Sequence, residues 1–233
     1  VGNLLNYRRA WRNQLMSKKS AKDPGKAVAA MEAAVTDSQY RIKCECAISM
    51  VELKLQMIQD ELSEEYGRMI VRDICSRIKT ADSICRKLQK KGYKCTFAEA
   101  TEKLNDMIGV RVTCFFEDDI YEIVKRISAH EDVTVVKEKD YIRKPKSNGY
   151  HSFHLIVEVP VYSDAGCERK RVEIQFRTVA MDFWAQLDYQ LCYKREISGA
   201  QGEDIQKELK KYAEEIARMD KNMMRIRKEI ETM

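Results

Sequence analysis

The chain has 233 residues, of which 34% are charged and 44% hydrophobic, and 42 basic against 37 acidic side chains give a net charge of +5. This composition excludes an intrinsically disordered chain, and the length allows one large domain or two small ones. No apolar run approaches the ~20 residues that cross a bilayer, and the N-terminal residues lack the apolar core of a secretion signal. We therefore expect a soluble cytoplasmic protein without a membrane partner.

The eight cysteines contain no Cys-x-x-Cys pair, and the chain has only three histidines. This usage predicts reduced thiols and no zinc centre. A metal site at Cys44 and Cys46 is disfavoured because side chains two residues apart on a helix do not converge.

The first 68 residues are predicted to form a helical N-terminal region. Residues 1–22 carry six basic side chains and no acidic one, and their apolar residues recur at helical spacing from Leu4 to Leu15. This favours a helix that docks its apolar stripe, and an arm that binds RNA or a membrane surface is the alternative. A break at residues 23–25 separates it from a long helical region that runs roughly from Lys26 to Tyr66.

Residues 69–195 alternate between short apolar runs and helices with N-capping residues. We predict strands at 69–75, 106–116, 133–136, 152–162 and 170–177, with a hairpin turn at 163–166. Residues 76–80 are predicted to be a turn, and Thr80, Thr96 and Thr178 are predicted to cap helices, as is typical of threonine. Another helix is expected at 117–130. This order predicts an α+β fold in which helices pack on a mixed sheet of about five strands.

The segment 171–178 alternates strictly between apolar and polar residues, which is typical of a half-buried strand. Its polar face carries an acid, an amide and a cation in a row, namely Glu173, Gln175 and Arg177. Upstream, a basic loop with Asn148-Gly149 leads through Tyr150 into another strand. Together these features indicate a site for a nucleotide polyphosphate.

A second basic cluster lies within residues 77–94, where a single acid, Asp82, opposes seven basic side chains: Arg77, Lys79, Arg86, Lys87, Lys90, Lys91 and Lys94. On the predicted helix, Ser83, Arg86, Lys87 and Lys90 share one face. A solvated face is the alternative explanation for such a run. However, the cluster begins where a strand feeds the N-terminus of a helix, and that arrangement suits phosphate.

Two acids stand apart from the surface mixture. Asp106 opens one apolar strand, and Glu173 lies within another. A carboxylate beside apolar residues is ordinarily a cap or a salt-bridge partner. Two of them on neighbouring strands that face basic groups provide what Mg²⁺ needs to hold a polyphosphate, because Mg²⁺ takes one or two protein carboxylates together with phosphate oxygens and water.

Five segments, taken together and in order, resemble the synthetase domain of the RelA/SpoT family. They are Arg77-Ile-Lys-Thr, Asp106-Met-Ile-Gly-Val-Arg, Lys139-Asp-Tyr-Ile, Lys144-Pro-Lys-Ser-Asn-Gly-Tyr-His-Ser-Phe-His and Val172-Glu-Ile-Gln-Phe-Arg-Thr. The resemblance spans residues 69–195. The sequence shows no segment like the hydrolase domain of the long members, so the chain resembles a small alarmone synthetase. Helices are expected on either side of its nucleotidyltransferase-like synthetase domain.

The resemblance implies transfer of the β,γ-pyrophosphate of ATP to the ribose 3′-OH of GDP or GTP, with release of AMP, in the stringent response. It implies that Asp106 and Glu173 are catalytic and hold Mg²⁺, and that Glu173 helps to deprotonate the 3′-OH. The implied ATP-binding residues are Arg77, Lys79, Ser83, Arg86, Lys87 and Arg111. Of these, Arg77 and Arg111 would sandwich the adenine.

The residues implied to bind the acceptor nucleotide are Lys146, Asn148, Tyr150, His154, Gln175 and Asp182. Tyr150 would stack on guanine. Two departures from the family pattern touch this side: Asp182 stands where relatives often have Asn, and Asp188-Tyr189 replaces a Glu-His pair. They leave the choice between GDP and GTP open. They also leave open a different acceptor, such as an adenine nucleotide or tRNA. An RNA-binding regulator remains the alternative from another class.

The tail from Asp204 to Met233 repeats apolar residues at alternating steps of four and three, over about four heptads. Its predicted seam consists of Ile205, Leu209, Tyr212, Ile216, Met219, Met223, Ile226 and Ile230. We predict that residues 196–233 form an oligomerisation helix, and packing on its own domain is the alternative. The resemblance implies a homotetramer, as in similar small synthetases.

Overall fold

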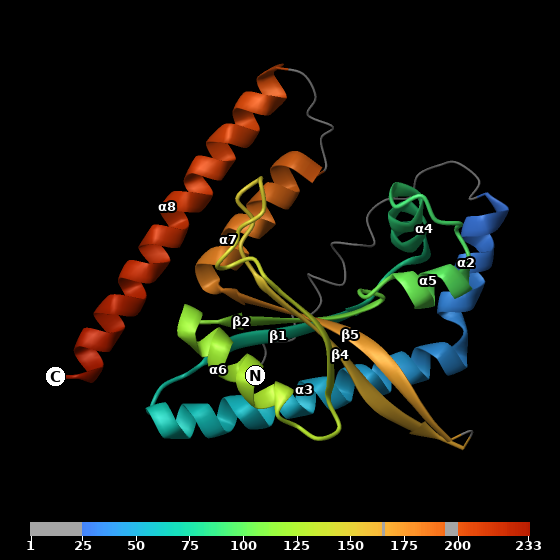
Figure 1. The fold of residues 1–233 in the computed structure, drawn as a ribbon, viewed down its shortest axis with the longest axis horizontal. Coiled ribbons are helices and arrows are strands. Elements are labelled where there is room, and N and C mark those ends of the chain that lie inside the picture. The colour runs from blue at the N-terminus through green and yellow to red at the C-terminus, as the bar shows by residue number, and fades with distance from the viewer. Residues whose placement is uncertain (1–24, 165, 194–199) are drawn as a thin grey trace, which may run out of the picture.

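The structure is a computed structural model that describes residues 25–164, 166–193 and 200–233 (Figure 1). The basic arm predicted at residues 1–22 lies outside the described residues. Within the described ranges, no helix is long and apolar enough to cross a membrane.

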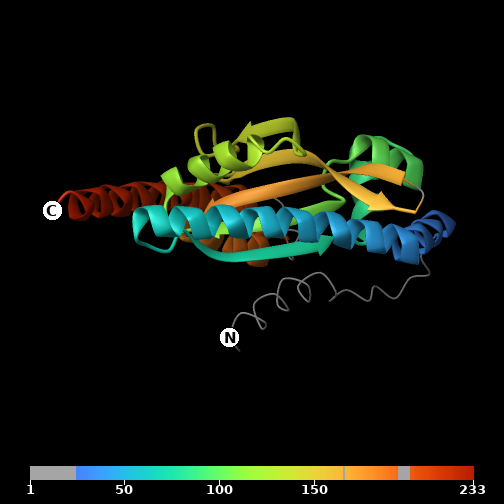
Figure 2. The same ribbon diagram turned by 90° about the horizontal axis from the view of Figure 1, so that it is seen from below.

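The N-terminal helical region consists of two helices, α2 (Lys26–Thr36) and α3 (Ser38–Tyr66). Asp37 separates them, and its side chain accepts a hydrogen bond from the backbone N–H of Tyr40 at 2.9 Å, which caps α3. Gly67, with φ of 63°, ends α3 in the left-handed conformation. α3 lies along one face of the sheet, as the second view makes plain (Figure 2).

The sheet has five strands in the order β1-β2-β5-β4-β3. The strands are β1 (Val71–Ile78), β2 (Ile108–Cys114), β3 (Thr134–Asp140), β4 (Phe153–Ser163) and β5 (Gly166–Thr178). β2 pairs with β5 in parallel, and the other neighbouring strands are antiparallel. The prediction of an α+β fold with a mixed sheet is therefore confirmed, and so is the hairpin between β4 and β5.

Three strand predictions were wrong in their bounds. β5 begins at Gly166 and not at residue 170. β1 continues through residues predicted to be a turn, because its ladder with β2 extends to Ile78 opposite Ile108. β3 extends to Asp140, which pairs with Phe153. Its charged residues Lys137-Glu138-Lys139 lie in an edge strand, where one side of the backbone has no partner strand and polar side chains are tolerated.

The remaining helices are α4 (Ala81–Lys90), α5 (Phe97–Lys103), α6 (Glu117–Ser128), α7 (Val179–Asp188) and α8 (Ala200–Glu231), with a short π-helix at Tyr189–Tyr193. The predicted caps Thr96 and Thr178 accept hydrogen bonds from the backbone N–H groups of Glu99 and Met181. Thr80 precedes α4, but its hydroxyl donates to the Ser83 hydroxyl and caps no backbone group.

The two faces of the sheet differ in character. The main core joins α3 and α6 to apolar residues of the strands, including Val110, Val112, Ile174 and Phe176. The register places Glu173 beside Gly109, and Gln175 beside both Arg111 and His154. Because neighbouring residues across a ladder point to the same face, these polar side chains gather on the face opposite the core.

The cysteine prediction was wrong for one pair. Cys85 in α4 and Cys95 before α5 form a disulfide, with their Cα atoms 5.1 Å apart. The turn after α4 brings together two residues ten positions apart in the sequence, and sequence spacing alone does not reveal that proximity. Cys44 and Cys46 are free, and Cys44 is buried.

Candidate active site

Asp106 and Glu173 form the acidic centre of the polar face. Both side chains are buried. The Asp106 Oδ2 atom accepts from Lys79 and from Lys87, the latter at 2.5 Å, while Asp106 Oδ1 is buried without a hydrogen-bond partner. The Glu173 Oε1 atom lies 3.2 Å from His154 Nδ1, and Oε2 accepts from Gln175 Nε2 at 2.7 Å.

The pKa values of these two carboxyl groups follow from opposing effects. Burial alone would raise the pKa of Asp106, but Lys79 and Lys87 outweigh it and bring the pKa to about 2. Burial acts in the same way on Glu173, and the hydrogen bonds from His154 and Gln175 bring its pKa to about 2 as well. Both carboxylates are therefore ionised at neutral pH.

These carboxylates fit a magnesium ion. The unpartnered Asp106 Oδ1 is a buried oxygen with spare acceptor capacity, and a nearby ionised Glu173 adds the second carboxylate. Among the described residues, no group of three or more His, Cys, Asp or Glu side chains could hold a metal. A cation here would need further oxygens from phosphate or water, and that is how Mg²⁺ is usually bound.

Five of the six predicted donor-side residues lie on β1, directly after it or on α4. The sixth, Arg111, lies in β2. Lys79 and Lys87 turn towards Asp106, and Ser83 accepts a hydrogen bond from Thr80 in the first turn of α4. Arg86 is more exposed and pairs with Asp82 at 2.7 Å. The fifth residue, Arg77, passes over Gly109. If residue 109 carried a Cβ atom, that atom would lie 3.6 Å from the Cγ and Nε atoms of Arg77.

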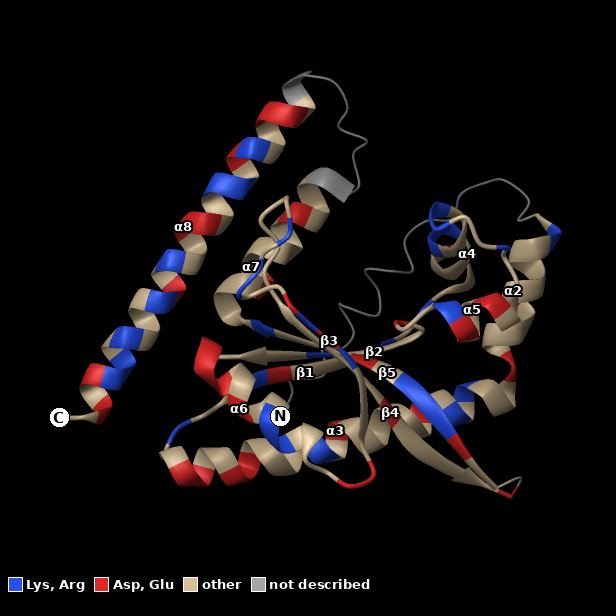
Figure 3. Cartoon of the chain, in the orientation of Figure 1, with Lys and Arg blue, Asp and Glu red and all other residues tan. Residues whose placement is uncertain are grey.

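Arg77 and Lys79 are unusual cations, because burial lowers the pKa of each below its ordinary value despite the neighbouring Asp106. The neighbouring cations are Lys87, Arg111 and Arg177, and the neighbouring carboxylates are Asp106 and Glu173. Positive charges therefore outnumber negative ones around Arg77 and Lys79. Such an excess of desolvated positive charge favours an anionic ligand, and polyphosphate is one. The charge-coloured view shows basic residues on α4 and along β5 (Figure 3).

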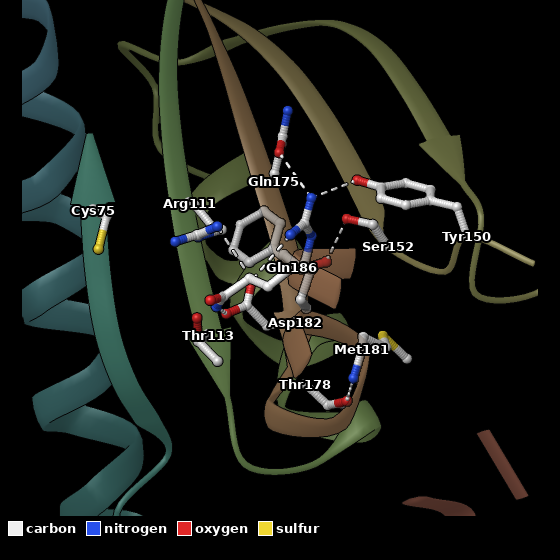
Figure 4. A network of polar contacts seen from close by, with 12 residues as sticks. Cys75, Arg111, Thr113, Tyr150, Ser152, Gln175, Thr178, Met181, Asp182 and Gln186 are labelled. Carbon is white, nitrogen blue, oxygen red and sulfur yellow. Dashed lines mark hydrogen bonds and ion pairs between the residues drawn. The ribbon is translucent and has the colours of Figure 1, made fainter. Parts of the chain in front are cut away.

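A chain of polar contacts crosses the sheet from Arg111 to Tyr150 (Figure 4). Arg111 and Arg177 both contact Asp182 Oδ1, at 3.2 and 2.9 Å, and Gln186 Nε2 donates to Asp182 Oδ2. Arg177 also donates to the Tyr150 hydroxyl at 2.9 Å. Burial would raise the pKa of Tyr150, but Arg177 and His154 outweigh it and bring the pKa to about 7.

The acceptor contact expected for Asp182 stays a prediction, and the geometry favours a supporting role for this residue. Its side chain is 1% exposed, and both of its oxygens are engaged by protein groups. Two arginines from β2 and β5 draw it inward from α7, so it supports site residues and does not face the open site.

The other predicted acceptor residues lie together around Tyr150. The Lys146 Nζ atom is 4.4 Å from the centroid of the Tyr150 ring, and the Asn148 side chain accepts from the Tyr150 backbone N–H. The Tyr150 hydroxyl is 2.9 Å from His154 Nε2. Gln175 and His154 also contact the Glu173 carboxylate. These contacts connect the acceptor side of the site to the acidic pair.

Sequence reasoning missed two contributors. Arg177 was noted on the polar strand face but given no role, although its position in the alternation was a usable signal. The second is Ala213 of α8, which packs against Gly149 in the basic loop. A Cβ at Gly149, whose φ is 89°, would stand 2.7 Å from the Ala213 Cβ. No local signal indicates that contact, because the two residues are far apart in the sequence.

Comparison with known proteins agrees with this geometry. Residues 76–198 match the family described as the region found in RelA / SpoT proteins. The chain is 40% identical to the GTP pyrophosphokinase YwaC of Bacillus subtilis, over 79% of this chain and 87% of YwaC. The chain belongs to the RelA/SpoT family. It is also 34% identical to the GTP pyrophosphokinase YjbM of the same organism, over 79% of this chain and 85% of YjbM.

Solved structures support the same membership. The structure of small alarmone synthetase 1 from B. subtilis bound to its product pppGpp has a TM-score of 0.74 and 31% identity, covering 83% of this chain and 99% of that one. Small alarmone synthetase 2 from B. subtilis has a TM-score of 0.71 and 38% identity, covering 81% and 97%. The family resemblance inferred from the five sequence segments is thus confirmed, while the predicted domain boundaries at 68 and 195 stay predictions.

Proposed function

We propose that this RelA/SpoT protein is a (p)ppGpp synthetase that transfers the β,γ-pyrophosphate of ATP to the ribose 3′-OH of GDP or GTP and releases AMP. The observation that carries this proposal is the polar sheet face, where two ionised carboxylates lie between a donor-side group of cations and an acceptor-side group around Tyr150. The related GTP pyrophosphokinases and the pppGpp-bound neighbour support the same reaction.

On the donor side, we assign ATP to Arg77, Lys79, Ser83, Arg86, Lys87 and Arg111. The planar guanidinium groups of Arg77 and Arg111 suit stacking on adenine, and the lysines and Arg86 suit the phosphates. Lys79 and Lys87 now neutralise Asp106, so they are held ready next to the place where the transferred phosphates must lie.

On the acceptor side, Tyr150 offers a ring for the guanine, and Lys146 and Asn148 fix the loop that carries it. Glu173 receives the proton of the 3′-OH as that oxygen attacks the β-phosphorus, and AMP leaves with the former bridging oxygen. His154 and Gln175 orient the Glu173 carboxylate through their hydrogen bonds. Asp106 and Glu173 would hold Mg²⁺, which when bound offsets negative charge on the transferred phosphates.

We further propose that the protein works in the cytoplasm during the stringent response as a homo-oligomer, with a tetramer as the expected state. The exposed apolar residues of α8 support the oligomer. An RNA-binding regulator is not favoured, because RNA binding would need neither Asp106 nor Glu173. A pyrophosphokinase with an adenine-nucleotide or tRNA acceptor remains the alternative within the same chemistry.

The test is to incubate the protein with Mg²⁺ and ATP labelled on its γ-phosphate, adding GDP, GTP, GMP, ADP or tRNA in separate reactions. We expect the label to appear in a new guanosine nucleotide with GDP and GTP. If only ADP or tRNA gave a labelled product, that molecule and not GDP or GTP would be the acceptor. Labelled inorganic phosphate as the sole product would contradict pyrophosphate transfer.

A further inference from the structure

Asp182 occupies the junction between the two halves of the site. Its Oδ1 atom is shared by Arg177 at 2.9 Å and Arg111 at 3.2 Å, and Gln186 of the same helix fixes Oδ2. All three charged side chains are less than a tenth exposed. One buried negative charge thus serves two buried guanidinium groups, which limits how strongly it holds either one.

The two arginines belong to different sides of the proposed site, Arg111 to the donor side and Arg177 to the acceptor side. Arg111 lies in β2, paired with Cys75 of β1 and Gln175 of β5, and it is one of the two arginines that we assign to adenine. Arg177 lies in β5 and donates to the Tyr150 hydroxyl, which belongs to the acceptor side. Figure 4 shows Asp182 close to Arg111 and Gln186.

We propose that Asp182 is a positioning residue that couples the donor and acceptor nucleotide sites, an inference that rests on the proposed function. When adenine stacks on the Arg111 guanidinium, the ion pair between Arg111 and Asp182 Oδ1 weakens. The carboxylate then holds Arg177 more tightly, and Arg177 fixes the Tyr150 hydroxyl. Each nucleotide therefore favours binding of the other, and linkage makes the effect reciprocal.

A purely structural role would have a different signature. If Asp182 only held α7 against the sheet, its loss would weaken both sites independently and leave their mutual effect unchanged. The readout must therefore be the ratio of affinities with and without the second nucleotide, because a single affinity does not separate the two roles.

Calorimetry would measure the affinity for GDP and for a non-hydrolysable ATP analogue, each alone and each with the other at saturation. For the wild type we expect each ligand to improve the other's affinity on the order of five-fold or more, and by the same factor. Asp182→Asn keeps the shape but removes the charge, so the factor should fall close to one. The matched control Asp204→Asn, at an exposed site on α8 that pairs with Lys207, should retain the wild-type factor.

Gln186→Ala is a second variant on the exposed side of α7. It keeps the Asp182 charge but frees Oδ2, so the factor should drop while the melting temperature is retained. The proposal would be overturned if both variants kept the wild-type ratio of affinities with and without the second nucleotide. It would also be overturned if that ratio were one in the wild type. If the wild type binds neither GDP nor GTP, the proposed function itself fails, and that result is distinct from independent binding of both nucleotides.

Discussion

Glu173 is held ionised by His154 and Gln175, on a strand whose other face is in the core. Glu173→Gln keeps the size of the side chain but removes the charge and the proton acceptor. We expect the rate of pyrophosphate transfer to fall by at least ~10²-fold, the lower range for removal of an acid–base group. Initial rates at saturating nucleotide would measure the loss.

The matched control for this variant is Glu168→Gln, which is in the same strand but contacts Lys43 and Lys170 near the hairpin. It should retain most of the activity. Near-full Mg²⁺-dependent synthesis by the Glu173 variant would remove that residue from the mechanism.

Tyr150 has two separable features, its ring and its hydroxyl. Tyr150→Ala should cost on the order of 1–3 kcal/mol of acceptor binding, as for other stacks of bases on aromatic rings, and leave the KM for ATP nearly unchanged. Tyr150→Phe should keep most of the stacking. A rise confined to the KM for ATP would mean that the donor and acceptor pockets have been assigned the wrong way round.

The Tyr150 hydroxyl also predicts a pH dependence of stability. Its pKa falls from 10.0 to about 7 because Arg177 and His154 outweigh burial. A group whose pKa is lowered on folding stabilises the protein fully above its unfolded pKa, and this stabilisation is lost as the pH falls through the folded value. The unfolding free energy contributed by Tyr150 should therefore rise between about pH 7 and about pH 10.

Denaturant titrations at several pH values would measure that rise, and Tyr150→Phe should lack it. The difference in near-ultraviolet absorbance between the two proteins should show one phenolate that forms near neutral pH. An equal pH dependence of stability in both proteins would exclude an ionised Tyr150.

At the scale of elements, α8 supports the loop that presents Tyr150. Trp184 of α7 donates to the Leu209 carbonyl at 3.0 Å, Thr178 donates to Asp220 at 2.5 Å, and Arg227 pairs with Asp118. These contacts hold α8 against the domain so that Ala213 meets Gly149. The loop has no room for a side chain at residue 149.

Ala213→Leu should therefore displace the loop and raise the KM for GDP or GTP by more than that for ATP. Steady-state kinetics with each substrate varied in turn would separate the two effects. Glu214→Leu, at an exposed position of α8, is the matched control for the introduced side chain. Equal changes in both KM values would indicate a general loss of structure and not a local displacement of the loop.

The strict alternation of residues 171–178 was enough to predict β5 and its polar face, because a half-buried strand leaves a period of two in the sequence. The same reasoning failed at Lys137-Glu138-Lys139, where an edge strand tolerates charge. It also gave no indication that Asp182 is buried, because that burial depends on two arginines from other strands. Likewise, the meeting of Gly149 and Ala213 is a product of tertiary folding and leaves no local pattern.

At the scale of the whole molecule, the predicted seam of α8 divides into two sets. Leu209 and Ile216 are half-buried, whereas six residues stay exposed: Ile205, Tyr212, Met219, Met223, Ile226 and Ile230. The half-buried residues pack on the helix's own domain, and the exposed residues are free to contact another subunit. The exposed set offers a stripe that a facing helix from another subunit would cover.

Met219→Glu with Ile226→Lys places charges at two exposed seam positions, 52% and 39% exposed in the single chain. We expect the assembly to dissociate while the synthetase domain stays folded, since a buried unpaired charge is costly. Sedimentation at micromolar concentration would report the mass. The control Glu214→Lys with Lys221→Glu, on the outer face of the helix, should keep the wild-type mass. An unchanged mass in the seam variant would exclude this stripe from the interface.

The central claim is that this sheet face joins a pyrophosphate from ATP to a guanosine 3′-OH. The most direct test follows AMP and the guanosine product in one reaction that contains the protein, Mg²⁺, ATP and GDP or GTP. The account predicts equal amounts of AMP and of a guanosine nucleotide carrying a 3′-pyrophosphate. ADP with inorganic phosphate, or AMP formed without a 3′-modified guanosine, would contradict it.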